Sequence, residues 1–240
     1  MTKLSVNINK IALIRNAREG NHPDLYQITR DLERFGADGI TVHPRPDERH
    51  IRYADIPILK DLVTTEFNIE GYPTEAFLKL VLDNQPDQCT LVPDAPDVLT
   101  SDAGWDCIKH KTFLKDVIGR LHDKGIRVSL FLEPDRQQLH AATETGTDRI
   151  EFYTGPYAAN YPNNPDQSVL AFTKAAKIAN QLNLGINAGH DLNLDNLKHF
   201  KQNIPKLLEV SIGHALISDA LYYGLANTVS MYQNLLGKKE

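Results

Sequence analysis

The chain has few cysteines and no long apolar run, which excludes several kinds of protein. Its 240 residues include only Cys89 and Cys107, so neither a disulfide framework nor a cysteine zinc site is indicated. No segment approaches the roughly 18 consecutive apolar residues that a membrane span needs. The first residues, MTKLSVNINK, lack the apolar segment of a secretory signal, and we therefore expect a cytoplasmic protein.

The chain also lacks an excess of positive charge. Its formal net charge is −5 at pH 7, which argues against binding to nucleic acid or to a membrane surface through a basic face. A phosphorylated substrate would therefore have to be bound by a local group of positive charges. No linker or low-complexity tract interrupts the sequence, and 41% of its residues are hydrophobic, so we expect one domain over residues 1–240.

Short apolar segments alternate with longer amphipathic segments along the chain. Eight of the short segments have the length and composition of β-strands: Leu4–Ile8, Gly39–His43, Glu66–Glu70, Cys89–Val92, Arg127–Leu132, Arg149–Tyr153, Gly185–Asn187 and Leu208–Ile212. Strands that alternate with helices of about ten to fifteen residues are typical of parallel βαβ units. Eight such units predict an α/β fold, namely a closed (β/α)8 TIM barrel with additional short helices.

The amphipathic segments predict helices with one apolar face. A helix with an apolar stripe from Leu25 onwards is expected to end at Gly36. A similar stripe from Ile217 through Leu221 to Tyr232 predicts a single final helix.

Polar residues stand at the ends of most of the predicted strands. They are Asn7, Asn9 and Lys10 after the first strand, His43, Arg45 and His50 after the second, Glu70 at the third, Glu151 within the sixth, His190 after the seventh and Gly213-His214 after the eighth. In a β/α barrel the carboxyl ends of the strands meet at one end, so we expect these residues to converge there. Two irregular segments, 93–106 and 154–165, follow the fourth and sixth strands and would lie at the same end.

Three of these residues are suited to proton transfer. A glutamate at the mouth of an apolar barrel would have a raised pKa and could act as a general base, which is the role we predict for Glu70. His43 and His190 are histidines, which titrate near neutral pH and can transfer protons in either direction. The sequence therefore predicts acid–base chemistry at this end of the barrel.

Two segments are suited to binding phosphate. Gly213-His214 directly precedes a predicted helix, and the N–H groups at a helix start bind phosphate in many barrels. The segment HPRPDERH contains Arg45, Arg49 and His50 within eight residues, and its prolines stiffen it. It predicts a rigid site for a second phosphate.

Six sequence fragments together identify a family that this chain resembles. They are NINKIALIRNAR, GADGITVHPRPDERHI, FNIEGYPTE, LVPD, INAGHDL and SIGHALI. In this order they resemble the pyridoxine 5′-phosphate synthase family of bacterial vitamin B6 biosynthesis, from about Leu4 to the last helix. The resemblance implies a β/α barrel that assembles as a homooctamer. It also implies the condensation of 3-amino-2-oxopropyl phosphate with 1-deoxy-D-xylulose 5-phosphate to pyridoxine 5′-phosphate, phosphate and water, without a metal or an organic cofactor.

The resemblance also implies roles for individual residues. His43 and Glu70 correspond to the proton acceptors of the family, and His190 to its proton donor. The implied ligands of the amino-ketone phosphate are Asn7, Arg18, the backbone at Asp191 and the pair Gly213-His214, and those of the sugar phosphate are Asn9, Lys10, Arg45, His50 and Thr100.

Two places depart from the family pattern. Asn9-Lys10 stands where the family has Asp-His, which places any proton transfer by that pair in doubt. Asp191 stands where glycine is usual, and its carboxylate would have to point away from a bound phosphate because like charges repel.

Three other functions are compatible with these residues. A sugar-phosphate isomerase or epimerase would share the phosphate site at the seventh and eighth strands, but it would not need the second site in HPRPDERH. A hydrolase could use His43, Glu70 and His190 as metal ligands, although the sequence lacks HxH and HExxH spacing. A binding protein could keep the barrel and lack the chemistry.

Overall fold

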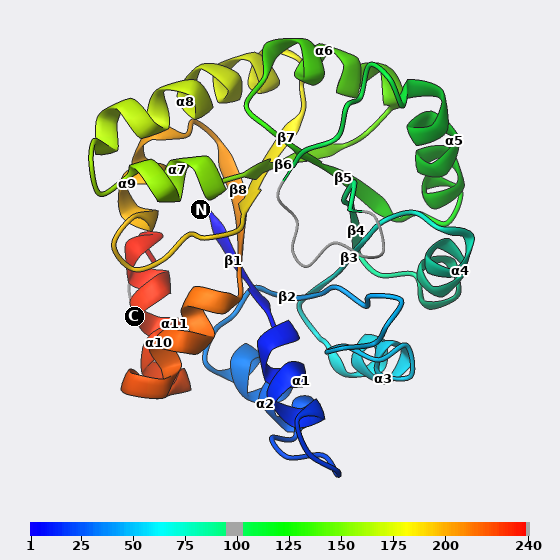
Figure 1. Cartoon of the computed structure of the whole chain (residues 1–240), viewed down its shortest axis with the longest axis vertical. Helices are drawn as coiled ribbons and strands as arrows, with labels where there is room; N and C mark the ends of the chain where they lie inside the picture. The colour runs from blue at the N-terminus through cyan, green and yellow to red at the C-terminus, as the bar shows by residue number, and fades with distance from the viewer. Residues whose placement is uncertain (95–102, 239–240) are drawn as a thin grey trace.

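The computed structural model describes residues 1–94 and 103–238, and its strands form a closed parallel barrel (Figure 1). The strands are β1 (Lys3–Asn7), β2 (Gly39–Val42), β3 (Glu66–Gly71), β4 (Gln88–Leu91), β5 (Arg127–Leu132), β6 (Arg149–Tyr153), β7 (Gly185–Gly189) and β8 (Leu207–Ile212). Each strand pairs with its neighbours in chain order, and β8 pairs with β1. This confirms the predicted (β/α)8 TIM barrel, with strand ends shifted by at most two residues.

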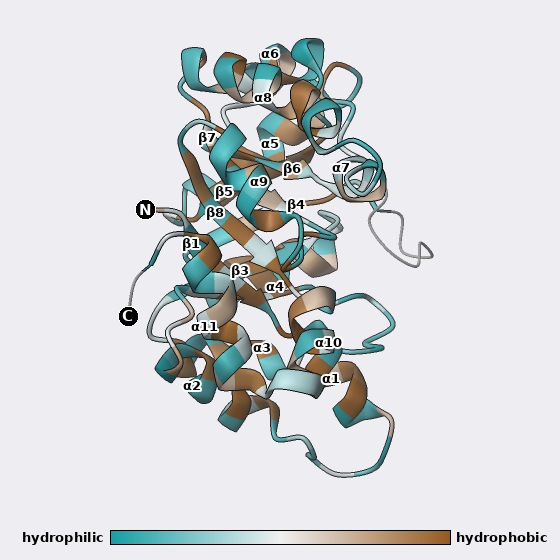
Figure 2. Ribbon diagram, turned by 90° about the vertical axis from the view of Figure 1, so that its left-hand side faces the viewer, coloured by the Kyte–Doolittle hydropathy of each residue, from teal (hydrophilic) through white to brown (hydrophobic). Residues whose placement is uncertain are grey.

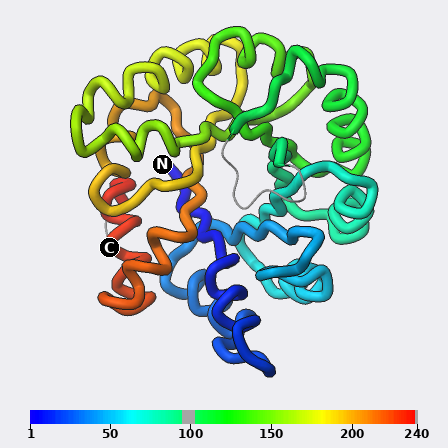
Figure 3. Tube along the Cα trace, in the orientation of Figure 1, coloured from blue at the N-terminus to red at the C-terminus, as the bar shows by residue number. Residues whose placement is uncertain are grey.

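Helices surround the barrel. They are α1 (Asn9–Asn16), α2 (Leu25–Arg34), α3 (Asp55–Leu62), α4 (Glu75–Asn84), α5 (Lys111–His122), α6 (Arg136–Thr145), α7 (Gly155–Asn160), α8 (Pro165–Gln181), α9 (Leu197–Asn203), α10 (His214–Tyr223) and α11 (Leu225–Leu235). Figure 3 shows the chain passing once around the cylinder, so that α10 and α11 return beside α1 and α2. Within the described ranges, no helix is both long and apolar enough to cross a bilayer.

Two helical segments differ from the sequence prediction. The apolar stripe from Ile217 to Tyr232 is divided between two helices, because Gly224, with a φ of 78°, lies between α10 and α11 and cannot continue a helix. Leu221, which we placed on that stripe, is 77% exposed. The segment 154–165, expected to be an irregular loop, contains α7, whose proline fits the first turn where no N–H donor is needed.

The strands have an apolar outer face, and most of their inner side chains are polar. On β1, Leu4 and Val6 are buried in the hydrophobic core, whereas Ser5 between them hydrogen-bonds Thr41 at 2.7 Å. Buried polar residues recur on the other strands: Asn68, Gln88, Thr90, Ser129, Glu151, Asn187, Glu209 and Ser211. Since successive strand residues point to opposite faces, the interior of the barrel is polar. The apolar interior that we expected beneath Glu70 is therefore not found. The outer helices alternate between hydrophobic and hydrophilic residues (Figure 2).

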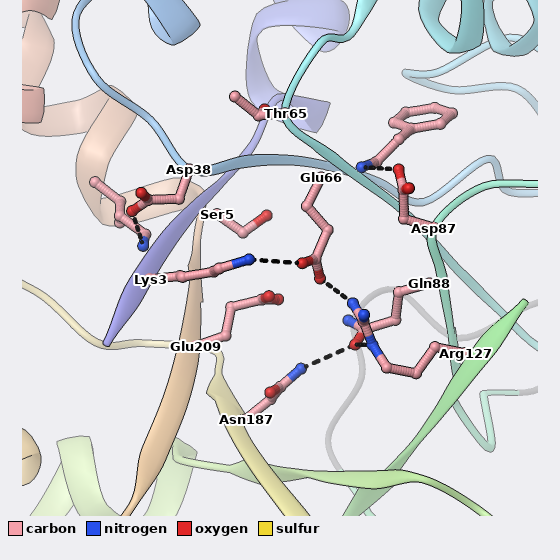
Figure 4. Close-up of polar contacts among 12 residues, drawn as sticks. Lys3, Ser5, Asp38, Thr65, Glu66, Asp87, Gln88, Arg127, Asn187 and Glu209 are labelled. Atoms are coloured by element: carbon pink, nitrogen blue, oxygen red, sulfur yellow. Dashed lines mark hydrogen bonds and ion pairs between the residues drawn. The ribbon is translucent and has the colours of Figure 1, made fainter. Parts of the chain in front are cut away.

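A charged network lies at the amino-terminal end of this polar interior (Figure 4). Glu66 on β3 is paired with Arg127 and accepts a hydrogen bond from Lys3 at 3.1 Å, while Arg149 lies 3.6 Å from Glu209. Burial raises the pKa of Glu209 to about 8, and the charge and hydrogen bond of Glu66 add to the rise. Burial alone would raise the pKa of Glu66 too, but its hydrogen bond with Glu209 and the charges of Arg127 and Lys3 lower it. Burial and the neighbouring Glu66 thus favour the protonated form of Glu209.

A buried ion pair joins α1, α2 and α3 to the loop after β2. Arg15 donates to both carboxylate oxygens of Asp55 at 2.8 Å and to the backbone oxygen of His50 at 3.2 Å. Asp55 also accepts a hydrogen bond from the Tyr26 hydroxyl at 2.9 Å. The Arg15 and Asp55 side chains are only 2% and 4% exposed. The loop that carries Arg45 and His50 is therefore held against the helices by these contacts.

We expect Asp55→Ala to lower the free energy of unfolding by about 3–5 kcal/mol, because it leaves the Arg15 guanidinium buried without a counter-charge. Urea unfolding followed by circular dichroism measures the change. Asp83→Ala is the matched control, since it removes an exposed partner of Lys79 within α4 and should cost at most about 0.5 kcal/mol. Equal stability losses in the two variants would show that the Arg15–Asp55 pair is not a special stabilising contact.

We expect the free energy of unfolding to fall as the pH rises from about 5 to 8, in part because of Glu209. The folded protein keeps the Glu209 proton up to a pKa of about 8, whereas the unfolded chain releases it near 4.5, so rising pH favours the unfolded state over this interval. Glu209→Gln cannot release a proton, and its stability should fall by about 1–3 kcal/mol less than that of the wild type. Chemical unfolding of both proteins at pH 5, 6, 7 and 8 tests this. The same dependence of the unfolding free energy on pH in the wild type and in Glu209→Gln would contradict it.

Candidate active site

A cavity of about 600 Å3 lies at the carboxyl ends of the strands. Its polar lining consists of Asn7, Asn9, Lys10, His43, Arg45, Arg49, His50, Glu70, Glu151, His190, Asp191, Ser211, Gly213 and His214. His43, Glu70 and His190 come from segments far apart in the sequence and meet in this cavity, as the barrel topology predicts. Of the other predicted site residues, Arg18 is exposed beyond the end of α1 and does not line it, and Thr100 lies outside the described residues.

Glu70 is held at the end of β3 by polar neighbours. Asn7 Nδ2 donates to Glu70 Oε2 at 3.4 Å, and the Ser211 side chain also hydrogen-bonds the Glu70 carboxyl group. Burial raises the pKa of Glu70 to about 8, and the negative charges of Asp94 and Glu209 contribute. The pKa is raised as the sequence predicts, but burial among other carboxyl groups causes it rather than an apolar barrel. A carboxyl group with this pKa exchanges its proton near neutral pH.

His43 and His50 both line the cavity, and burial favours their neutral imidazoles. Burial lowers the pKa of His43 well below its usual value, and the Arg45 charge lowers it further. Burial also lowers the pKa of His50, to about 4, with help from Arg45 and Arg49. The backbone N–H of Ile51 donates to His50 Nδ1 at 2.9 Å, so the single ring hydrogen of His50 lies on Nε2. His43 can thus accept a proton, and His50 can donate a hydrogen bond.

The loop HPRPDERH forms a positively charged wall of the cavity together with Lys10. Arg45 is 5% exposed and is paired with Asp94 at 3.0 Å, which fixes its position. The Oδ1 atom of Asn9 accepts a hydrogen bond from the backbone N–H of His43 at 3.0 Å and so ties the start of α1 to this loop. The wall is therefore rigid, as the two prolines suggested, and Asp94 balances part of its charge.

The start of α10 forms another part of the cavity. Gly213 is its N-cap residue, and no side chain caps the helix. A Cβ atom on Gly213 would lie 3.0 Å from Asn7 Cβ and 3.1 Å from the backbone oxygen of Asn7, so a side chain would crowd β1. Gly213, His214 and Ala215 all line the cavity, which brings the positive end of the helix to it. This arrangement suits a phosphate group.

His190 and Asp191 form a tight turn after β7. Both residues have positive φ angles, of 76° and 56°. The carboxylate of Asp191 is turned toward His190, with 2.8 Å between Asp191 Oδ2 and His190 Nδ1. The hydrogen bond with His190 lowers the pKa of Asp191. The ring of Tyr153 meets that of His190 edge-on, with 5.3 Å between the centroids.

Glu151 is a cavity residue to which the sequence analysis assigned no role. Its side chain is buried, and burial followed by the Glu70 charge raises its pKa well above the usual value. A Cβ atom on Gly189 would overlap Glu151 Oε1, so the carboxyl group depends on a glycine in the neighbouring strand. Its Oε2 atom has no hydrogen-bond partner among the described residues. The available signal was a glutamate between Ile150 and Phe152 in the strand RIEFY.

The barrel is similar to those of solved structures with unrelated sequences. The crystal structure of 3-keto-L-gulonate-6-phosphate decarboxylase from Vibrio cholerae matches 98% of this chain and 97% of its own, with a TM-score of 0.66 and 9% identity. At this identity the similarity supports the fold alone.

Sequence relatives cover nearly the whole chain. The family model described as "Pyridoxal phosphate biosynthesis protein PdxJ" matches residues 4–238. A protein of Flavobacterium johnsoniae named pyridoxine 5′-phosphate synthase is 60% identical over 97% of this chain and 98% of its own length. A protein of Cytophaga hutchinsonii with the same name is 58% identical over 99% of this chain and 100% of its own. The chain therefore belongs to the PdxJ family of pyridoxal phosphate biosynthesis proteins.

Proposed function

We propose that this enzyme condenses 3-amino-2-oxopropyl phosphate with 1-deoxy-D-xylulose 5-phosphate to form pyridoxine 5′-phosphate, phosphate and water. The observation that carries the proposal is the cavity of about 600 Å3 in which His43, Glu70 and His190 lie between two regions suited to phosphate. The relatives named pyridoxine 5′-phosphate synthase support it. The proposed reaction needs no metal or organic cofactor. We propose that the enzyme carries it out in the cytoplasm.

The two phosphate groups would bind at different walls of the cavity. The amino-ketone phosphate would bind at the start of α10, where Gly213 and His214 present backbone N–H groups. The sugar phosphate would bind at Lys10, Arg45 and His50, where positive charges and the Nε2–H of His50 are available. The separation of the walls would place the amine of one substrate beside the ketone of the other.

The acid–base groups lie where the reacting carbons would meet. The amine attacks the ketone and forms an imine, a base removes a carbon-bound proton to give an enamine, and water is eliminated. Loss of phosphate, an aldol-type closure and a final dehydration complete the aromatic ring. Glu70, with a pKa near 8, suits the proton abstraction. Neutral His43 can accept a proton, and His190 would donate one to a leaving group.

Glu151 would contribute a hydrogen bond rather than a negative charge. Burial and the charge of Glu70 raise its pKa, which favours the protonated carboxyl group, and no described residue hydrogen-bonds its Oε2 atom. A protonated carboxyl group can donate to a substrate hydroxyl or carbonyl oxygen. We propose that Glu151 binds the reacting part of the substrates in this way.

The geometry favours this condensation over the alternatives. An isomerase or epimerase acts on one phosphorylated substrate and has no use for the second positive wall around Arg45. A metal-dependent hydrolase would need clustered ligands, and the described part of the chain contains no group of three His, Cys, Asp or Glu side chains placed to hold a metal ion. A binding protein would take up both compounds unchanged. Incubation of the pure protein with both substrates, followed by mass spectrometry for pyridoxine 5′-phosphate, separates these functions.

We expect Glu70→Gln to lower kcat by about 100-fold or more while both substrates still bind, because an amide cannot accept the carbon-bound proton. Steady-state assays measure kcat, and calorimetry measures binding of each phosphate compound. Glu144→Gln, at an exposed residue of α6 outside the cavity, is the control and should keep full activity. Near wild-type turnover in Glu70→Gln would remove Glu70 from the mechanism.

We further propose that the chain self-associates, as a homooctamer, through a surface on α1 and α10. Leu13 and Ile14 on α1 and Leu221, Tyr222 and Tyr223 on α10 are all 42% or more exposed, and the two helices are adjacent. Large apolar side chains exposed together on one surface favour a protein contact.

The double variant Leu221→Glu/Tyr222→Glu should dissociate into smaller species, because each change would bury a charge in the subunit contact. Sedimentation velocity measures the change. Ile58→Glu introduces a charge at an exposed apolar residue of α3 and serves as the control. An unchanged sedimentation coefficient in the double variant would place the contact elsewhere.

A further inference from the structure

The turn at His190 and Asp191 is an unusual piece of backbone at the edge of the cavity. Two successive non-glycine residues have left-handed conformations, with φ angles of 76° and 56°. Such conformations are costly for residues with a Cβ atom, and they persist where surrounding contacts impose them. Asparagine and aspartate tolerate this region better than other residues do, which fits the presence of Asp191 at the second position.

Side chains from both flanking segments hold this turn. The Thr154 hydroxyl, which follows β6, contacts the backbone oxygens of Gly189, at 2.8 Å, and of His190. On the other side, Asn196 Nδ2 donates to the backbone oxygen of Asp191 at 3.1 Å. The left-handed turn is thus anchored at both ends. One consequence of its shape is that the side chains of two adjacent residues lie in contact.

That contact joins a ring nitrogen to a carboxylate. Asp191 Oδ2 lies 2.8 Å from His190 Nδ1, within the range of a charge-assisted hydrogen bond. The imidazole is 27% exposed and the carboxylate 49% exposed. The edge-on ring of Tyr153 packs against the imidazole from β6 and limits its rotation. Both Asp191 and Tyr153 therefore constrain the orientation of His190.

The pKa of Asp191 is shifted in the opposite direction from the pKa values of Glu70 and Glu151 in the same cavity. Tyr153 on β6 contacts His190, and the titratable groups that line the same cavity include Glu151 on β6, His214 on α10 and Glu70 on β3. Burial raises the pKa values of Glu151 and Glu70 above their usual range. The pKa of Asp191 is instead lowered by its hydrogen bond with His190, and the charge of His214 adds to this. Asp191 is thus the ionised carboxylate beside His190.

We propose that Asp191 is a positioning residue that orients His190, accepts its Nδ1–H and stabilises its protonated form, leaving Nε2 to transfer the proton. The inference rests on the proposed function, which assigns His190 as the proton donor. In the proton-transfer step the Nε2–H bond of the imidazolium breaks and the proton passes to the leaving group. The Nδ1 proton stays between the two side chains, and Asp191 remains ionised.

Two substitutions separate this role from a structural one. Asp191→Asn keeps the size of the side chain and its tolerance of the left-handed turn, but it loses the charge, and its amide can donate to Nδ1. Asp191→Gly suits the backbone at least as well and keeps the N–H group, but it removes the acceptor. If Asp191 had only a structural role, Asp191→Asn would leave kcat nearly unchanged. The proposal predicts instead that Asp191→Asn lowers kcat at least as much as Asp191→Gly does.

We expect both variants to lose kcat by about 10- to 100-fold, with KM for the amino-ketone phosphate changed by less than about threefold. The alkaline limb of the pH profile of kcat should move to lower pH by about 0.5–1 unit, because the protonated donor loses its counter-charge. Asp166→Asn is the matched control. It removes a carboxylate 3.5 Å from His199, on helices outside the cavity, and should leave both kcat and the profile unchanged.

Nitrogen-15 NMR of the His190 ring provides a test that does not depend on the reaction. The wild type should carry its neutral-state hydrogen on Nδ1, and Asp191→Asn should shift it toward Nε2. Wild-type kcat and pH profile in Asp191→Asn, or an unprotonated Nδ1 in the wild type, would overturn the proposal. If the wild type forms no pyridoxine 5′-phosphate, the proposed function fails, and the NMR result still decides whether Asp191 sets the state of His190.

Discussion

The chemistry of this protein depends on the inner polar face of its barrel. Burying hydroxyl, amide and carboxyl groups is unfavourable unless they hydrogen-bond one another. A chain of such bonds runs from Ser5 through Thr41 and Asn68 to Thr90, with donor–acceptor distances of 2.7–3.3 Å. These contacts satisfy the hydrogen-bonding groups in the middle of the barrel with uncharged side chains. Carboxyl groups above and below that layer are therefore shielded from water without being fully paired.

Shielding without full pairing explains why the carboxyl groups of the barrel have raised pKa values. Burial is the largest cause for Glu70, Glu151 and Glu209, and each also experiences the charge of another carboxyl group. The same burial acts in the opposite direction on His43, whose pKa falls. One physical cause thus produces both a weakly acidic carboxyl group and a neutral imidazole in a single cavity.

The positions of these groups are maintained by contacts outside the cavity. The Arg15–Asp55 pair holds the loop of Arg45 and His50, and Thr154 holds the turn at His190. Glycines at 189 and 213 leave space for Glu151 and Asn7 beside the backbone. The site is therefore built from rigid strand ends and short anchored loops, and a substrate would meet groups that are already oriented.

The sequence by itself determined the barrel, the strand ends and most of the residues of the cavity. Strand periodicity and alternating helices are local properties, and parallel closure brings every carboxyl end to one side, so His43, Glu70 and His190 could be expected together. Family motifs added the proposed substrates.

The tertiary structure alone decided what depends on contacts between distant segments. These are the polar inner face, the pairing of Arg45 with Asp94, the place of Glu151, and the exposure of Arg18. The break at Gly224 and the turn of Asp191 toward His190 depend on backbone angles that residue types permit but do not specify. Burial and pairing result from how segments pack, and no single segment of sequence encodes them.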